Sequence, residues 1–149
     1  MRISQEALEA LLAQVQKPAR YIGQEWNSVV KDWGATHVRL ALAYPDTYEI
    51  GMSNLGLALL YDLVNRRPEF TAERVYAPWT DMEAAMRQAN VPLFSLETRR
   101  SLDEFDVIGF SLQHELNFTN VLNMLDLAGL PVRSRPATAA PALRRASGR

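Results

Sequence analysis

The sequence of 149 residues contains no cysteine. Without thiols the chain forms no disulfide, no thiolate zinc site and no cysteine nucleophile. It also holds no iron–sulfur cluster through cysteine ligands. Any redox chemistry linked to this chain must therefore be supplied by groups outside it.

Two targeting features are also missing. The first residues, MRISQEALEA, do not show the basic segment followed by an apolar segment that marks a secretory signal peptide. No apolar run approaches the roughly 18 residues that a membrane-spanning helix needs. We therefore expect a cytoplasmic protein with no membrane partner.

Acidic residues outnumber basic ones over most of the chain. The formal net charge of −1 combines 16 Lys and Arg with 17 Asp and Glu, but five of the arginines follow Asp126, the last acidic residue. The chain up to Asp126 therefore has 11 basic against 17 acidic residues, a net charge of −6. A body this acidic is poorly suited to neutralising phosphates, so nucleic acid is not an expected partner.

The spacing of apolar residues predicts an alternation of helices and strands. A first helix is predicted between Ser4, a capping residue, and Pro18, which ends it. Further helices are predicted at 57–66, 80–89 and 117–128, and strands at 37–44, 74–77, 91–96 and 106–112. Thr80 and Glu83 have the spacing of a capping box, and Gly129 stands at the C-terminal cap of the last helix.

This alternation is typical of an α/β fold with a parallel sheet. The run at 106–112, DVIGFSL, is almost continuously apolar, which predicts a strand buried on both faces. We therefore expect a three-layer Rossmann or flavodoxin-like sheet, with helices on both faces, that is incomplete at its C-terminus.

The composition divides the chain into three parts. Residues 1–33 comprise the first helix and an irregular strap, in which the aromatic residues Tyr21, Trp26 and Trp33 are expected to pack against the domain surface. Residues 34–133 carry the α/β pattern. Residues 134–149 have no acidic or aromatic residue and no periodicity, which predicts disorder. We interpret this tail as a truncated or out-of-frame end, with a natural disordered tail as the alternative.

Two loops are the candidate binding sites, because open α/β sheets bind ligands beyond the carboxyl ends of their strands. They lie at 45–56 and at 113–117. In the first loop, Gly51 and Gly56 allow close approach of a ligand or a positive φ, and otherwise serve as plain turn residues. Ser53 and Asn54 cap the next helix or donate to a ligand.

The charged residues near these loops have structural alternatives as well. For the carboxylates of Asp46 and Glu49, a role in helix caps and loop ties is favoured over a role in acid–base chemistry. His114 follows the strand at 106–112, so a functional role and a role as a structural loop residue are equally supported. The histidines His37 and His114 are far apart in sequence, which argues against a metal site.

Three long segments carry a resemblance to a known family. They are KPARYIGQEWNSVVKDW, YPDTYEIGMSNLGLALLYDLVNRRPEFTAERVYAPWTDMEAAMR and PLFSLETRRSLDEFDVIGFSLQHELNFTNVLNMLDLAGLPVR. Over residues 17–133 the chain resembles the N-terminal module of a family of bacterial radical S-adenosylmethionine (SAM) proteins, a module similar to cobalamin-binding domains. The resemblance implies a downstream radical domain that binds S-adenosylmethionine and a [4Fe–4S] cluster through a CxxxCxxC motif, which is absent from this sequence.

The cobalamin motif matches only in part. Cobalamin domains of this type carry Asp-x-His-x-x-Gly after their first strand, where the histidine ligates cobalt and the aspartate tunes it. The matching positions here are Asp46, Tyr48 and Gly51, so a phenol stands in place of the ligand. A phenol with a pKa near 10 is a poor axial ligand at neutral pH. Ser111, at the end of the strand at 106–112, resembles the serine found near the cofactor's nucleotide tail.

Three functions remain open from the sequence. The first is a cobalamin-binding-like module that serves a radical SAM enzyme, either by holding a corrinoid without a histidine ligand or by positioning substrate. The second is a cofactor-free scaffold or interaction domain. The third, an independent flavodoxin-like enzyme, needs a catalytic group that the sequence does not offer, so no catalysis is expected from the chain alone.

Overall fold

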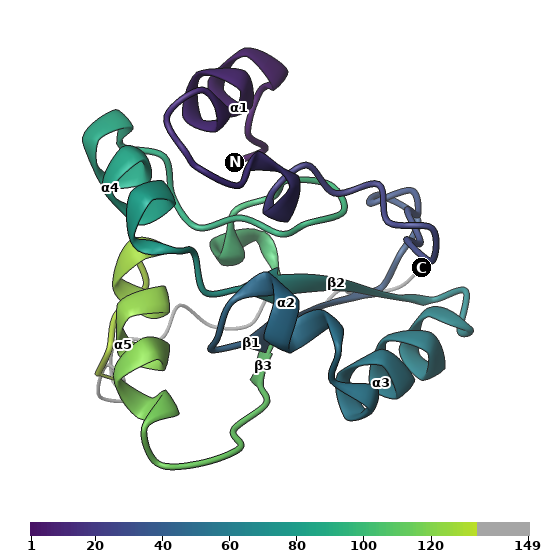
Figure 1. Cartoon of the computed structure of the whole chain (residues 1–149). Helices are drawn as coiled ribbons and strands as arrows, with labels where there is room; N and C mark the ends of the chain where they lie inside the picture. The colour runs from purple at the N-terminus through teal and green to yellow at the C-terminus, as the bar shows by residue number, and fades with distance from the viewer. Residues whose placement is uncertain (134–149) are drawn as a thin grey trace.

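The computed structural model describes residues 1–133 (Figure 1). Its strands are β1 (Val38–Tyr44), β2 (Phe70–Tyr76) and β3 (Val107–Phe110). Its α-helices are α1 (Gln5–Leu12), α2 (Tyr48–Met52), α3 (Leu55–Asn65), α4 (Thr80–Ala89) and α5 (Asn117–Leu127), with short 3-10 turns at Pro18–Arg20 and Leu102–Glu104. The expectations that fall on residues 134–149 lie outside the described residues.

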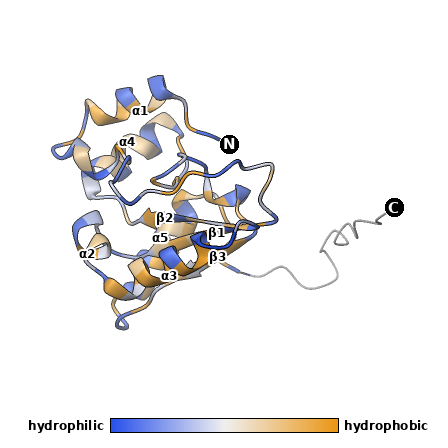
Figure 2. Ribbon diagram, turned by 90° about the vertical axis from the view of Figure 1, so that its right-hand side faces the viewer, coloured by the Kyte–Doolittle hydropathy of each residue, from blue (hydrophilic) through white to orange (hydrophobic). Residues whose placement is uncertain are grey.

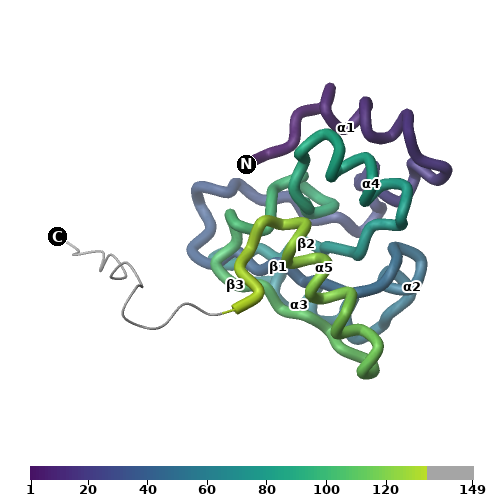
Figure 3. The backbone as a smooth tube through the Cα atoms, turned by 90° about the vertical axis from the view of Figure 1, so that its left-hand side faces the viewer, coloured from purple at the N-terminus to yellow at the C-terminus, as the bar shows by residue number. Residues whose placement is uncertain are grey.

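The three strands form one parallel sheet in the order β2-β1-β3. Side chains of β1 alternate between two apolar clusters, as a strand's period of two requires. Ala41 and Ala43 face a cluster that includes residues of α1, α4 and α5, while Leu42 and Tyr44 face one that includes residues of α2 and α3. Helices therefore cover both faces of the sheet (Figures 1 and 3), and the expected three-layer α/β arrangement is confirmed.

The sheet is covered unevenly across its width. The central strand β1 is buried from Ala41 to Tyr44, and β2 is buried from Thr71 to Tyr76. By contrast β3 lies at an edge of the described sheet, none of its residues is buried, and Val107 is 49% exposed. The expectation that 106–112 is buried on both faces is therefore wrong, because no strand among the described residues pairs with its outer side.

The predicted strand at 91–96 is also wrong. Only an isolated antiparallel bridge links Phe94 to Ser101 there. The segment is apolar because it fills the core, with Leu93, Phe94 and Leu96 buried. Its backbone N–H groups each bond to a different part of the chain, for instance Leu93 to the Leu127 carbonyl, so no ladder of hydrogen bonds with one strand forms.

Helix ends were predicted with mixed success. α4 spans Thr80–Ala89 as expected, but its N-cap is Trp79 and no capping box forms, because Thr80 is already helical. At the end of α5, Gly129 has φ of +68°, and the N–H groups of Gly129 and Leu130 bond back to the carbonyls of Asp126 and Leu125. This Schellman geometry confirms the predicted glycine cap.

The strap at 17–33 packs only in part as expected. Trp33 meets the ring of Phe105 edge-on at 5.1 Å between centroids, and the Tyr21 hydroxyl accepts a hydrogen bond from the Trp79 N–H. Trp26, however, is fully exposed. Within residues 1–133, no helix is long and apolar enough to cross a membrane.

Candidate functional site

The carboxyl ends of β1 and β2 are joined by backbone hydrogen bonds. The Ala77 N–H donates to the carbonyls of Tyr44 and Asp46, at 3.3 and 3.0 Å. On the other side of β1, the Ser111 N–H donates to the Ala43 carbonyl. The loops that follow all three strands therefore meet at one edge of the sheet, which is where open α/β folds bind ligands.

A polar pocket of about 210 Å³ opens at this edge. The loop after β1, the segment between β2 and α4, and one side of α5 enclose it. Its lining consists of Asp46, Thr47, Ala77, Pro78, Trp79, Thr80, Glu83, Asn120 and Asn123. Six of these residues carry side-chain oxygen acceptors, as carboxylates, amides or hydroxyls. The indole of Trp79, which is 48% exposed, supplies an apolar wall.

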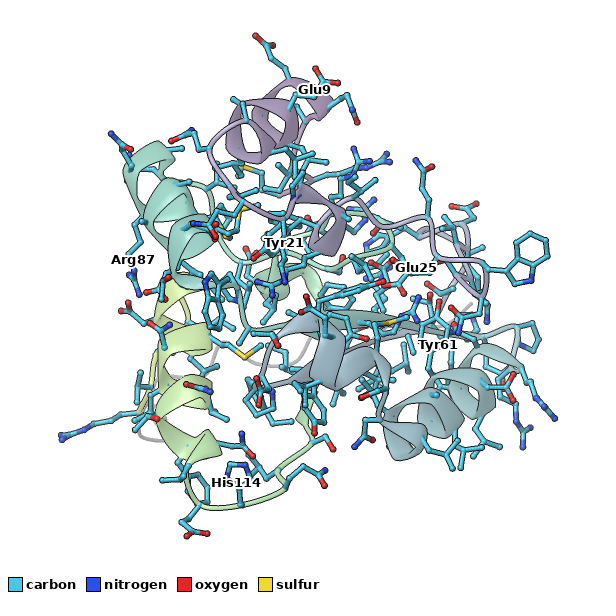
Figure 4. The ribbon with its side chains drawn as sticks, viewed as in Figure 1. Glu9, Tyr21, Glu25, Tyr61, Arg87 and His114 are labelled. Carbon is cyan, nitrogen blue, oxygen red and sulfur yellow. The ribbon has the colours of Figure 1, made fainter. Side chains whose placement is uncertain are left out.

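One wall of the pocket is fixed by an ion-pair network between α4 and α5. Arg87 donates to the Glu83 Oε1 at 2.9 Å, to the Asp126 Oδ2 at 2.8 Å and to the Asn123 Oδ1 at 2.8 Å. The Asn123 Nδ2 donates in turn to the Glu83 Oε2 at 2.9 Å. Arg87 thus lies where the two helices meet (Figure 4), and both carboxylate oxygens of Glu83 are held in place.

Two asparagines of α5 hold the loop that follows β1, which borders the pocket. The side-chain amides of Asn117 and Asn120 both donate to the Pro45 carbonyl, at 3.4 and 2.8 Å. The Asn117 Oδ1 accepts from the N–H groups of Gln113 and His114. Asn117 is only 3% exposed, so one buried amide joins the two loops that the sequence identified as candidates.

Of the predicted site residues, Asp46 alone lines this pocket. Its Oδ1 accepts from the Thr47 N–H at 2.7 Å, and it turns the chain from β1 into α2. The loop tie that the sequence favoured is therefore present, and the carboxylate also borders the pocket. Within residues 1–133, no group of three or more His, Asp or Glu side chains gathers as a metal site.

The Tyr48 and Gly51 positions of the motif do not line the pocket. The Tyr48 ring meets Tyr76 edge-on at 5.7 Å between centroids, in the cluster beneath α2 and α3. Gly51 lies in α2 without a positive φ, and a Cβ there would overlap the Tyr76 ring. The glycine is therefore needed for close packing against Tyr76, and of the alternatives given for it the positive φ is absent.

Ser53, Asn54 and Gly56 have local roles. Asn54 caps α3 by accepting from the Leu57 N–H at 2.9 Å, as expected. The Ser53 hydroxyl donates to the Ile50 carbonyl at the end of α2, so Ser53 does not cap α3. Gly56 is helical, and the positive φ, one of the alternatives for it, is absent there too.

Ser111 and His114 lie on the loop between β3 and α5. The Ser111 hydroxyl accepts from the Gln113 side chain at 3.3 Å. His114 is exposed and lies apart from the other labelled residues (Figure 4), and neither residue lines the pocket.

Sequence reasoning missed most of the pocket. Trp79, Thr80 and Glu83 follow β2, and the carboxyl end of this strand was not considered as a binding edge. Asn120 and Asn123 are spaced three apart on α5. The sequence did offer one sign of this pocket. Polar residues stand one turn apart at the start of a helix that follows a parallel strand. The sequence instead assigned Thr80 and Glu83 to a capping box.

A second polar cluster is buried between β2 and the strap. The Arg74 guanidinium donates to the Glu97 Oε1 at 2.7 Å, and the two side chains are 4% and 0% exposed. Arg74 also donates to the Asn27 Oδ1 and the Ser28 Oγ, and it lies over the Tyr61 ring at 4.4 Å. The cluster holds the strap onto the sheet.

Several tyrosines in and beside this cluster resist ionisation. Burial raises the pKa of Tyr48 to about 12, with a further contribution from the Glu25 carboxylate. Burial also raises the pKa values of Tyr21, Tyr61 and Tyr76 above the usual value near 10. Tyr48 is therefore a neutral phenol at neutral pH.

These shifts predict a loss of stability at alkaline pH. A phenol whose folded pKa is raised stabilises the fold fully below its unfolded pKa near 10, and this contribution falls as the pH rises towards the folded pKa. We expect the free energy of unfolding to decrease between about pH 10 and pH 12, and phenolate absorbance to rise together with unfolding. Titration in the ultraviolet with parallel circular dichroism tests this. Normal titration of Tyr21, Tyr48, Tyr61 and Tyr76 in the folded chain would contradict it.

The fold and the pocket together define the class of the protein, an α/β domain with a polar pocket at the carboxyl edge of a parallel sheet. The chain matches the family described as radical SAM proteins, N-terminal, over residues 56–143, which is more than half of its 149 residues. The chain belongs to this N-terminal family of radical SAM proteins. Neither a curated protein nor a solved structure matches it.

Proposed function

We propose that this chain is a positioning module of a radical SAM protein, and that its pocket at the carboxyl edge of the sheet holds part of the substrate for a downstream radical domain. The observation that carries the proposal is the pocket itself, which is polar and is built by residues of α4, α5 and the loop after β1. The family match supports the link to radical chemistry. The chain has no cysteine to bind the cluster, so S-adenosylmethionine and the [4Fe–4S] cluster belong to the other domain.

The lining of the pocket indicates what kind of group it accepts. Carboxylate and amide oxygens from Asp46, Glu83 and Asn120 favour a ligand that donates hydrogen bonds, such as one with amino or hydroxyl groups. The volume of about 210 Å³ lies below the roughly 300–1,000 Å³ of pockets for drug-sized molecules. The pocket therefore suits a small metabolite, or one end of a larger substrate.

A ligand screen by nuclear magnetic resonance tests this function. Small amino- and hydroxyl-bearing metabolites are added to the isotopically labelled chain, and we expect one class to shift the amides of Asp46, Thr80 and Asn120 together. Thr80→Val removes a lining hydroxyl and should weaken that binding. The matched control, Thr119→Val on the exposed side of α5, should leave it unchanged. Shifts scattered over the surface, or equal effects of both variants, would contradict the proposal.

A corrinoid is the second candidate ligand. The placement of Asp46, Tyr48 and Gly51 directly after the central strand β1 supports this candidate. The cobalamin-binding domains that the chain resembles hold their cofactor at the same edge of the sheet. The packing of Tyr48 on Tyr76 and its raised pKa argue that no cobalt–oxygen bond forms to this phenol. A corrinoid would therefore be held without a protein ligand to its cobalt.

Tyr48→His tests the corrinoid candidate, because it restores the Asp-x-His-x-x-Gly pattern. If the edge has a corrinoid-binding shape, the variant should bind hydroxocobalamin roughly tenfold or more tightly than the parent chain, with a spectral shift that reports nitrogen ligation. Tyr48→Phe is the matched control, since it keeps the ring packed on Tyr76 and offers no ligand. If neither the parent nor Tyr48→His changes the cobalamin spectrum, the corrinoid candidate fails and the positioning module stands.

A further inference from the structure

The thioether sulfur of Met52 accepts two hydrogen bonds. Met52 ends α2, and its Sδ accepts from the Tyr76 hydroxyl at 3.0 Å and from the Arg74 Nη1 at 3.3 Å. A thioether is a weak acceptor, whereas a phenol and a guanidinium are strong donors. Within residues 1–133, this sulfur is the one acceptor to which the Tyr76 hydroxyl donates. Two strong donors therefore meet at an acceptor that bonds them poorly.

A small cavity of about 20 Å³ is bordered by Met52 and by both of its donors. Its lining consists of Asn27, Gly51, Met52, Asn54, Leu57, Ala58, Arg74 and Tyr76. A cavity needs roughly 10–15 Å³ to hold one water molecule, so this one has room for a single oxygen atom. The space and the two donors can together receive an oxygen that is bonded to the sulfur.

Small solutes can reach this sulfur from solvent. Met52 is half-buried, and Figure 2 shows α2 at the rim of the molecule beside α3. Asn27 and Ala58, which also border the cavity, are exposed. The methionines that are buried in the core are at most 1% exposed, and these are Met82, Met86 and Met124. Since the sequence has no cysteine, Met52 is the internal sulfur that is most open to a soluble oxidant.

We propose that Met52 is a site of sulfoxidation, and that the fold around it holds the sulfoxide. Hydrogen peroxide supplies the oxygen. A sulfur lone pair attacks one peroxide oxygen, the S–O bond forms as the O–O bond breaks, and the departing hydroxide takes up the remaining proton and leaves as water. The sulfur is oxidised by two electrons, and the peroxide is reduced. The new oxygen occupies the cavity and accepts from Tyr76 and Arg74 in place of the sulfur.

The sulfoxide ties α2 more firmly to the buried cluster beneath the strap. Its oxygen is a stronger acceptor than the thioether, and Arg74 also holds Asn27 and Ser28 of the strap. Oxidation of a methionine in an apolar core disrupts packing, because it places a polar oxygen there without a partner. At Met52 the partners are already in place, so the oxidised chain keeps its fold.

Peptide mass spectrometry of the folded chain after exposure to hydrogen peroxide tests the site. We expect Met52 to gain one oxygen roughly tenfold or more faster than Met82, Met86 or Met124, which burial protects. Met1, which is 60% exposed, gives the rate of an open methionine in the same sample. The sulfoxide of Met52 should be mainly one epimer, because the cavity receives the oxygen on one side of the sulfur, whereas Met1 should give both. Reductases specific for each epimer distinguish the two products.

Urea denaturation of the oxidised chain tests whether the fold holds the product. We expect its midpoint to equal or exceed that of the unoxidised chain. Tyr76→Phe keeps the ring and removes the donor, so oxidation should lower the midpoint of this variant. The matched control is Tyr44→Phe, at a buried tyrosine of the same cluster, and it should respond to oxidation as the parent chain does. Met52→Leu measures what oxidation of Met1 contributes.

Three results would overturn the proposal. The first is oxidation of Met52 as slow as that of the buried methionines, and the second is equal amounts of both epimers at Met52. The third is a parent chain that oxidation destabilises as much as it destabilises Tyr76→Phe. None of these results bears on the pocket, whose ligand screen reads out at Asp46, Thr80 and Asn120. The oxidation site and the proposed function therefore fail or stand separately.

Discussion

Glu97→Ala is expected to lower the free energy of unfolding by about 3–5 kcal/mol, because it leaves the buried Arg74 guanidinium without its carboxylate. Glu97 accepts from both the Nε and the backbone N–H of Arg74, at 2.7 Å each. With Arg74 only 4% exposed, water cannot replace these bonds without opening the strap. Urea denaturation followed by circular dichroism measures the loss as a lower midpoint.

Two controls separate the buried pair from ion pairs in general. Asp62→Ala breaks the exposed pair with Arg66 and should cost about 0.5 kcal/mol or less. The double variant Arg74→Met, Glu97→Leu removes both charges and keeps the apolar volume, so it should be more stable than Glu97→Ala alone. If the double variant is the less stable of the two, Arg74 stabilises the fold mainly through Asn27, Ser28 and Tyr61.

The sequence predicted the architecture well because the main elements have strong local patterns. The bounds of α4 and the glycine cap after α5 follow from helical spacing and from a residue that takes a positive φ readily. The three-layer order follows from the alternation of strands and helices. These features depend on neighbours in the sequence, so a single sequence is enough to find them.

Features set by long-range contacts were predicted less well. The sequence of the apolar segment at 91–96 is equally compatible with a strand in a ladder and with a segment that fills the core. Only the backbone hydrogen bonds of Leu93 and Leu96 to distant carbonyls distinguish the two structures. α2 was taken for a loop because its five residues are too short to show a helical period. For Gly51 the sequence left ligand approach, a positive φ and a plain turn role open, and it gave no sign of the packing constraint from Tyr76, 25 positions away in the chain.

The candidate site shows the same limit. Asp46 was found because it directly follows a strong strand, and Asn54 because capping is local. Asn120 was missed, although its amide holds the Pro45 carbonyl, because that contact spans 75 positions. A pocket between three segments is visible in the sequence only once the strand order is known.

Leu42→Ala is expected to cost about 2–5 kcal/mol of unfolding free energy, because it removes a large side chain from the cluster between the sheet and α3. Leu42 is 5% exposed and shares this cluster with Leu57 and Tyr61. It lies on the central strand, with β2 and β3 paired on either side, so the surrounding backbone is held and cannot close fully over the cavity. Urea denaturation should therefore show a lower midpoint with little change in slope.

Two comparisons make this test specific to the core. Leu59→Ala deletes the same atoms from a side chain that is 54% exposed on α3, and its effect should stay within about 0.5 kcal/mol. Thr80→Val, at the pocket, should leave stability nearly unchanged while it weakens ligand binding, since Thr80 is exposed. Equal losses for Leu42→Ala and Leu59→Ala would mean that the cluster beneath α3 is not a close-packed core. The placement of α3 on the sheet would then be wrong.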